Sequence, residues 1–111
     1  MTQCQKHNGN NDIDTWHVYG QLKRELTKFS KITNKYIIMH DTSIDGIKGE
    51  TIRVGWDANK QSAESGIPVE EICKGLTYAI NEFLHNNPDW YVKDVFTNNN
   101  GLTILARKSL Q

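Results

Sequence analysis

The apolar positions in the first part of the chain predict a helix followed by a strand. Residues 18–32 carry apolar side chains at helical spacing, which predicts an amphipathic helix with one buried stripe; the stripe consists of Leu22, Leu26 and Phe29. Asp14 or Thr15 is a candidate N-cap for this helix. Residues 36–39 are apolar without alternation, and this pattern favours a strand that is covered on both faces.

A second helix and a hairpin follow in the last third of the chain. Pro68 is predicted at the first helical position, where proline is favoured. The apolar face of this helix consists of Ile72, Leu76, Ala79, Ile80 and Phe83. Residues 90–96 and 102–107 are rich in β-branched and aromatic side chains, and the Asn- and Gly-rich residues 97–101 join them. This pattern predicts an antiparallel hairpin.

Two segments lack a core-facing pattern. Residues 1–12 are almost entirely polar, so we expect a disordered tail followed by a single domain over residues 13–111. Residues 43–67 form a long, polar, glycine-containing segment, which we expect to be a lid or a substrate loop. In that loop Glu50, Arg53 and Trp56 are candidate contacts to a substrate, although the tryptophan could also serve only to pin the loop to the surface.

The composition narrows the classes of partner. Thirteen basic and thirteen acidic residues cancel, so there is no electrostatic reason to expect nucleic acid or an anionic membrane as a partner. No apolar run reaches the length of a membrane span, and the polar N-terminus has no signal-peptide core. We therefore expect a soluble, cytoplasmic protein. Cys4 and Cys73 are predicted to be free thiols.

The order of elements and three motifs resemble the C-terminal half of a class I S-adenosylmethionine-dependent methyltransferase, in the branch related to cephalosporin hydroxylase and rhamnosyl O-methyltransferase. The motifs are YIIMHDT (36–42), GLTYAINEFL (75–84) and TNNNGLTIL (97–105). The resemblance covers residues 13–108. It implies an α/β fold with a partial Rossmann-like sheet, in which residues 13–19 end strand four, residues 36–42 form strand five and residues 90–107 form the antiparallel hairpin.

The resemblance also implies S-adenosylmethionine as cofactor and a hydroxyl group of a small molecule or sugar as acceptor. Members of the family hold the cofactor mainly through a glycine-rich turn in their first half, and this sequence has no Gly-x-Gly pattern. We therefore expect the isolated chain to be inactive in methyl transfer. It would be a truncated product or one half of a split enzyme whose complementing N-terminal half binds the cofactor.

The resemblance implies a metal site as well. Metal-dependent members of the fold hold a divalent ion with a carboxylate after strand four and two ligands after strand five, and the matching residues here are Asp14, His40 and Asp41. An imidazole among carboxylates makes such a site more suitable for manganese, iron or zinc. Alternatively His40 is a general base. His17 either faces the acceptor or packs at the first helical turn, Asp14 is equally a helix cap, and Asp41 could simply begin a turn.

Two other functions are compatible with the sequence. The chain could be a non-enzymatic interaction module or a homodimer that pairs through an exposed sheet edge, with the strand at residues 36–42 lying at that edge. It could also be a remnant without activity.

Overall fold

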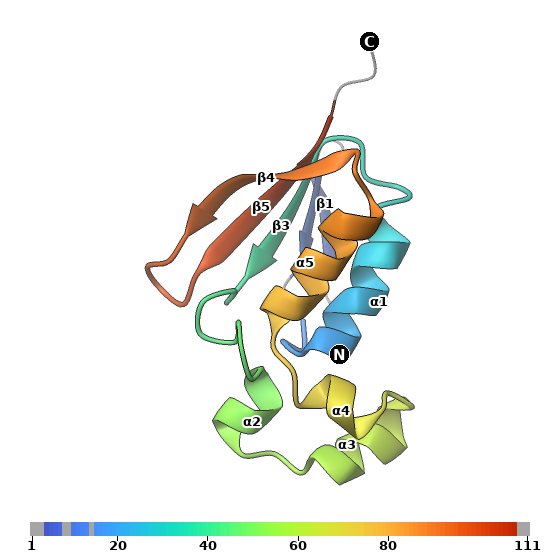
Figure 1. Cartoon of the computed structure of the whole chain (residues 1–111), viewed down its shortest axis with the longest axis vertical. Helices are drawn as coiled ribbons and strands as arrows, with labels where there is room; N and C mark the ends of the chain where they lie inside the picture. Colours follow the sequence, from blue (N-terminus) through green and yellow to red (C-terminus); the bar gives the residue numbers. More distant parts are fainter. Residues whose placement is uncertain (1–3, 8–9, 14, 109–111) are drawn as a thin grey trace.

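The computed structural model describes residues 4–7, 10–13 and 15–108, and its strands form one five-stranded sheet in the order β1-β2-β3-β5-β4 (Figure 1). The strands are β1 (Cys4–His7), β2 (Asn10–Ile13), β3 (Tyr36–His40), β4 (Trp90–Phe96) and β5 (Leu102–Arg107). The helices are α1 (Tyr19–Phe29), α2 (Glu50–Val54), α3 (Ala58–Ser65), α4 (Val69–Ile72) and α5 (Leu76–Asn86). β2 and β3 are parallel, and all other neighbouring pairs are antiparallel. The chain is a small, compact α/β domain.

The two longest helices, α1 and α5, lie side by side on one face of the sheet (Figure 1). The predicted apolar stripes of both helices are buried there. They pack on the side chains of Ile13, Ile37, Met39 and Leu105, which belong to three neighbouring strands. Since burying each such side chain is worth roughly 1.5–3 kcal/mol, this layer is the main source of stability.

The prediction that β3 is covered on both faces is wrong. Its residues alternate between buried and half-buried, with Ile37 and Met39 under the helices and Tyr36, Ile38 and His40 on the other face. The physical reason is that both long helices lie on the same face. The continuous apolar run in the sequence therefore marks one buried face and one half-exposed apolar face.

The beginning of the chain differs from the predicted disordered tail. Residues 4–7 and 10–13 are paired as β1 and β2, because backbone groups can extend a sheet even where the side chains are polar. The expectation that residues 36–42 lie at the edge of the sheet is also wrong, since β2 and β5 flank β3. The outer strands are β1 and β4.

The long polar segment and the predicted second helix each contain two separate helices, which the sequence pattern does not predict. Residues 43–67 contain α2 and α3, and the helix predicted from Pro68 is split into α4 and α5 around Gly75. A small second cluster of Val18, Ile67 and Ile72, with Trp16 and Ala58 against it, joins these short helices to the start of α1.

The split at Gly75 comes from a close approach of two backbones. A Cβ atom at Gly75 would lie only 2.3 Å from the carbonyl oxygen of Gly46. The first N–H groups of α5 have no side-chain cap; instead, the N–H groups of Leu76 and Thr77 donate to the carbonyl oxygens of Asp45 and Gly46, at 2.9 and 3.0 Å. The segment after β3 thus caps α5 with its own backbone.

The C-terminal hairpin has the predicted bounds, and its prediction is confirmed. Its turn contains three consecutive residues with positive φ, Asn99, Asn100 and Gly101, as the Asn and Gly composition indicates. No helix among the described residues has both the length and the apolar content to cross a membrane.

Replacing Gly75 with alanine tests the contact between α5 and the segment after β3. The φ angle of Gly75 is −88°, which alanine adopts without strain, so the cost is steric. We expect Gly75→Ala to lower the free energy of unfolding by more than about 2 kcal/mol in urea melts. Gly55→Ala is the control, because Gly55 has φ +85° but open space around it, and it should cost about 1 kcal/mol. Equal losses would contradict the close approach.

Candidate functional site

The chain turns sharply where β3 ends, and this turn presents the first carboxylate of the site. Asp41 has a φ of +58°, a left-handed conformation that Asp tolerates better than most residues. Its N–H group donates to the carbonyl oxygen of Gly101 at 2.9 Å, and the N–H groups of Ser43 and Ile44 both donate to the carbonyl oxygen of Asn100. The hairpin turn therefore braces the segment that follows β3.

The second carboxylate belongs to Asp45, one helical turn further along. The N–H group of Asp45 donates to the carbonyl oxygen of Asp41 at 3.0 Å, and this spacing brings the two side chains to the same side of the turn. The Asp45 side chain is fully buried. Arg53 from α2 donates to both of its oxygens, with Nε–Oδ1 at 2.6 Å and Nη2–Oδ2 at 3.2 Å. A buried carboxylate needs such a partner, because desolvation penalises its charged form.

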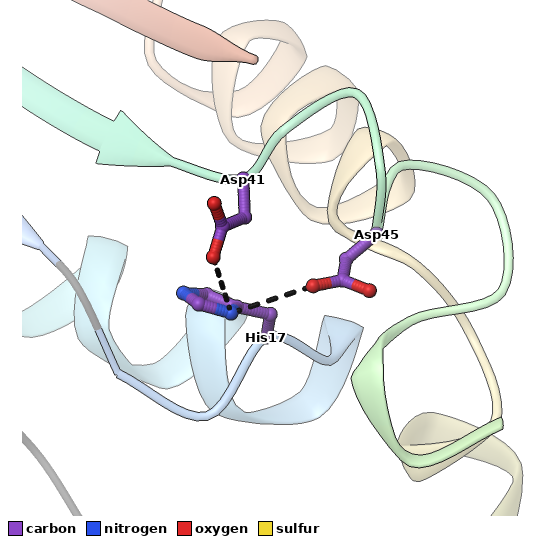
Figure 2. Close-up of side chains that lie close together, drawn as sticks. All are labelled: His17, Asp41 and Asp45. Carbon is purple, nitrogen blue, oxygen red and sulfur yellow. Dashed lines mark ion pairs between the residues drawn. The ribbon is translucent and has the colours of Figure 1, made fainter. Parts of the chain in front are cut away.

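His17 reaches these carboxylates from the segment between β2 and α1 (Figure 2). Its Nδ1 atom lies 3.3 Å from Oδ2 of Asp41, 3.4 Å from Oδ2 of Asp45 and 3.7 Å from Oε1 of Glu50. The backbone of His17 is also fixed, since its carbonyl oxygen accepts from the Glu50 N–H group at 2.7 Å and its N–H group donates to Oε1 of Glu50. The imidazole side chain is 11% exposed.

The cluster carries a negative charge that attracts cations. Three carboxylates, those of Asp41, Asp45 and Glu50, surround His17, and Arg53 contributes one positive charge. The carboxylates therefore outnumber the positively charged side chain that contacts them. The hydrogen bond to Asp45 raises the pKa of the Arg53 guanidinium, so this arginine stays charged. The ligand atoms of His17, Asp41 and Asp45 all lie within 4.8 Å of one another.

The structure brings together two of the residues that the sequence singles out. Asp41 and His17 belong to the cluster, whereas Asp14 lies outside the described residues. His40 is the last residue of β3 and pairs with Leu102, and strand alternation assigns it to the face opposite Met39. His40 is therefore not a member of the described cluster.

Sequence reasoning did not select Asp45 as a site residue, and it considered Glu50 and Arg53 only as substrate contacts. The available signal for Asp45 was its spacing of four from Asp41, which favours two carboxylates on one side of a helical turn. The signal was weak, because nothing in the sequence indicates that the loop turns helically at this point.

A second buried carboxylate belongs to Glu25 of α1. The Thr15 hydroxyl donates to Oε1 of Glu25, whose residue is only 4% exposed. Burial raises the pKa of the Glu25 carboxyl. The prediction of Thr15 as an N-cap is wrong, since Val18 occupies the N-cap position of α1. The Thr15 side chain instead ties the end of β2 to the middle of α1.

Glu25 should make the stability of the fold depend on pH. Because its folded-state pKa is raised, the folded protein binds the proton more tightly than the unfolded chain, and stability falls as pH rises from about 4.5 through the folded pKa. Glu25→Gln cannot ionise but keeps the oxygen that accepts from Thr15. We expect this variant to be more stable than the parent at neutral pH, with the advantage lost near pH 4, in urea melts at several pH values.

The exposed Glu64→Gln provides the control and should leave the pH profile unchanged. An advantage of Glu25→Gln that is the same at every pH would contradict the raised pKa.

No protein-family model, curated protein or solved structure matches the chain.

Proposed function

We propose that this chain is the acceptor-side, C-terminal segment of a class I S-adenosylmethionine-dependent methyltransferase that acts on hydroxyl groups with the help of a divalent cation. One observation carries the proposal: His17, Asp41 and Asp45 meet beyond the carboxyl ends of β2 and β3, which are neighbouring parallel strands. Open α/β sheets bind their ligands at this position. The order strand, helix, strand, helix and antiparallel hairpin supports the same family.

The donor atoms of the cluster fit a divalent cation. Ligands bound at 2.0–2.2 Å to one ion lie about 3 Å from one another, and Nδ1 of His17 is 3.3 and 3.4 Å from the two aspartate oxygens. One imidazole with two carboxylates is a donor set that suits manganese, iron or zinc. Arg53 orients the Asp45 carboxylate from the other side, as outer-shell partners of metal ligands do.

A bound cation of this kind lowers the pKa of an acceptor hydroxyl and orients it toward the methyl donor. The residues of the chain have separate roles in holding the site together and in contacting the acceptor. Asp45, which is fully buried, anchors the site, whereas the Asp41 side chain is 29% exposed and therefore accessible to an acceptor. Glu50 holds the His17 backbone and keeps the imidazole in place. His40 remains a predicted general base.

A hollow along α3 supports a sugar as acceptor. It has a volume of about 350 Å³ and is lined by Trp56, Asp57, Lys60, Gln61 and Glu64. Trp56 is 46% exposed, and an exposed indole face beside carboxylate and amide groups suits a ring that is apolar on its faces and polar on its edges. Trp56 and Asp57 come shortly after α2, the helix that supplies Glu50 and Arg53 to the cluster.

The cofactor half is the other part of the proposal. A glycine-rich, S-adenosylmethionine-binding half, in the same gene product or on a separate polypeptide, would complete the sheet on the side of β2. β1 is the outer strand on that side, paired antiparallel to β2. Completion of the sheet would therefore require a strand that adds to β1 or replaces it.

A second function is supported by the other edge of the sheet. β4 is an outer strand, and Tyr91, Val92, Val95 and Phe96 on it are 42–56% exposed. Such an edge can pair with another chain, which favours an interaction module or a homodimer. The bulge between Val92 and Asp94 opposes this pairing. A dimer in sedimentation velocity that Val95→Lys dissociates would favour this second function.

Cation binding by the purified chain tests the cluster. We expect saturable 1:1 binding of Mn²⁺ in isothermal titration calorimetry, weakened at least about tenfold by Asp41→Asn, which removes a charged ligand while asparagine tolerates the left-handed backbone. Asp94→Asn, which removes a carboxylate whose side chain is 43% exposed and pairs with Lys93, should bind like the parent. Equal affinities of the two variants would contradict the proposed site.

Methyl transfer tests the activity. The tagged chain is isolated from its own organism with the polypeptides that accompany it, and is incubated with radiolabelled S-adenosylmethionine and a small-molecule extract. We expect label in a small molecule that is lost on addition of EDTA and in the Asp41→Asn variant. Label that neither EDTA nor Asp41→Asn reduces, or no label in the presence of Mn²⁺, would contradict the proposed function even if the cation binds.

A further inference from the structure

The outer strand β4 exposes apolar side chains at the edge of the sheet. Tyr91, Val92, Val95 and Phe96 are 42–56% exposed. β5 pairs with one side of β4, and among the described strands none pairs with its other side. Figure 1 shows the end of this hairpin projecting away from α1 and α5. A further strand can therefore pair with β4, and the order of the side chains along β4 decides which strand fits.

The two valines of β4 project from the sheet face that carries α1 and α5. Val92 pairs with Leu105 of β5, and Val95 pairs with Thr103. Leu105 belongs to the core under the helices, and Thr103 shares its face because the two residues are two positions apart in one strand. Directly paired residues project from the same face of a sheet. Both valines therefore belong to the helix face, although they lie at its exposed edge.

The other side chains of this segment project from the open face, on the opposite side of the sheet. Three of them pair with the alternate residues of β5, which belong to that face. The pairs are Tyr91–Ala106, Asp94–Ile104 and Phe96–Leu102. The register with β5 skips Lys93, because a bulge lies between Val92 and Asp94. The Nζ atom of Lys93 lies 5.7 Å from the centroid of the Tyr36 ring, which is on the open face, so Lys93 projects from the same face.

The faces of residues 91–96 consequently follow an order that is the same in both directions along β4. The order is open, helix, open, open, helix, open. The strict alternation of a regular strand cannot produce this order, and the bulge produces it because Lys93 and Asp94 project from one face. Opposed residues of an antiparallel pair must share a face. A regular strand therefore matches β4 residue for residue on only one side of the bulge, whereas a second β4 matches all six positions.

A register that opposes Lys93 of one copy to Asp94 of a second copy also brings complementary side chains together. Val92 then faces Val95 of the second copy, and Tyr91 faces Phe96 of the second copy. The twofold symmetry repeats each of these three pairs. Opposite charges, β-branched side chains and aromatic side chains are the combinations that stabilise neighbouring strands. Asp94, which already pairs with Lys93 of its own chain at 3.1 Å, gains a second ammonium group, and the exposed apolar side chains of the edge gain partners.

From this order we propose that two copies of the chain pair antiparallel through β4, with the twofold axis between Lys93 and Asp94, so that their two sheets form one continuous sheet. The proposal rests on the second function proposed above for the β4 edge and identifies the partner as a second copy of this chain. It does not involve the cation cluster at His17. A bulge and a lysine at an edge disfavour pairing with a regular strand, and in this register both features favour the second copy.

Sedimentation velocity of the full chain and of two charge-reversal variants tests the register. We expect the parent to form a dimer. Lys93→Glu places like charges opposite each other at both symmetric pairs, and so does Asp94→Lys, so each variant alone should raise the dissociation constant of the dimer at least about tenfold. An equimolar mixture of the two variants restores opposite charges at both pairs and should dimerise like the parent. Lys31→Glu and Glu64→Lys, which reverse exposed charges outside β4, are the controls and should also dimerise like the parent.

Recovery of the dimer in the mixture separates a loss of pairing from a loss of folding, because a misfolded variant could not restore it. The proposal is overturned if the parent is monomeric, which would leave the edge for a strand of another protein, if the mixture stays as monomeric as its components, or if the controls weaken the dimer as much as the β4 variants do. A dimer that Val95→Lys dissociates but either charge reversal leaves intact would keep the second function and overturn this register. None of these outcomes decides Mn²⁺ binding or methyl transfer, which have their own tests.

Discussion

The segment that follows β3 is held between the hairpin turn and the start of α5, and the arrangement of the site depends on this contact. Its carbonyl groups at Asp45, Gly46 and Ile47 accept the N–H groups of Leu76, Thr77 and Gly75. The carbonyl groups of Asn100 and Gly101 accept N–H groups from its other end. Both contacts satisfy backbone groups that would otherwise lack partners at a helix start and a turn. Asp41 and Asp45 are therefore placed by the backbone, without help from each other's side chains.

The fixed backbone makes it possible to hold like charges close together. Asp45 is fully buried and lies near Asp41 and Glu50, and such an arrangement is unfavourable unless cations compensate it. Arg53 supplies one positive charge with two hydrogen bonds, and His17 supplies a nitrogen that can carry a proton or bind a metal ion. In this account the remaining negative charge is what a divalent cation would neutralise.

The sequence pattern predicted those parts of the fold that depend on side-chain periodicity. The buried stripe of α1, the apolar face of α5 and both hairpin strands follow directly from spacing and composition. The pattern did not predict those parts of the fold that depend on backbone hydrogen bonds or on packing against neighbouring elements. β1 and β2 have polar sequences and form by sheet pairing, and the break at Gly75 depends on contact with a segment about thirty positions away. The open face of β3 depends on where both helices pack.

The same distinction applies to the candidate site. Asp41 could be predicted because it follows the apolar run closely, whereas His17 was predicted only as a residue that either faces the acceptor or packs at the first helical turn. Asp45 and Arg53 join the site only because the loop turns helically after Asp41 and α2 folds back against it. His40 directly follows the same run, but strand alternation assigns it to the face opposite Met39, and the group of ligand atoms found among the described residues consists of His17, Asp41 and Asp45. The position of Asp41 after the apolar strand indicates at which end of the sheet the site lies. Which other residues belong to the site depends on tertiary contacts.

Paramagnetic relaxation by Mn²⁺ tests most directly whether this cluster is a cation site. In amide proton–nitrogen spectra of the chain, substoichiometric Mn²⁺ should first broaden the signals of His17, Asp41, Asp45 and their immediate neighbours. Signals near carboxylates outside the cluster, such as the exposed Glu64 and the partly exposed Asp94, should remain sharp at the same metal concentration. Broadening that begins at those exposed carboxylates and spares His17 and Asp45 would contradict the account.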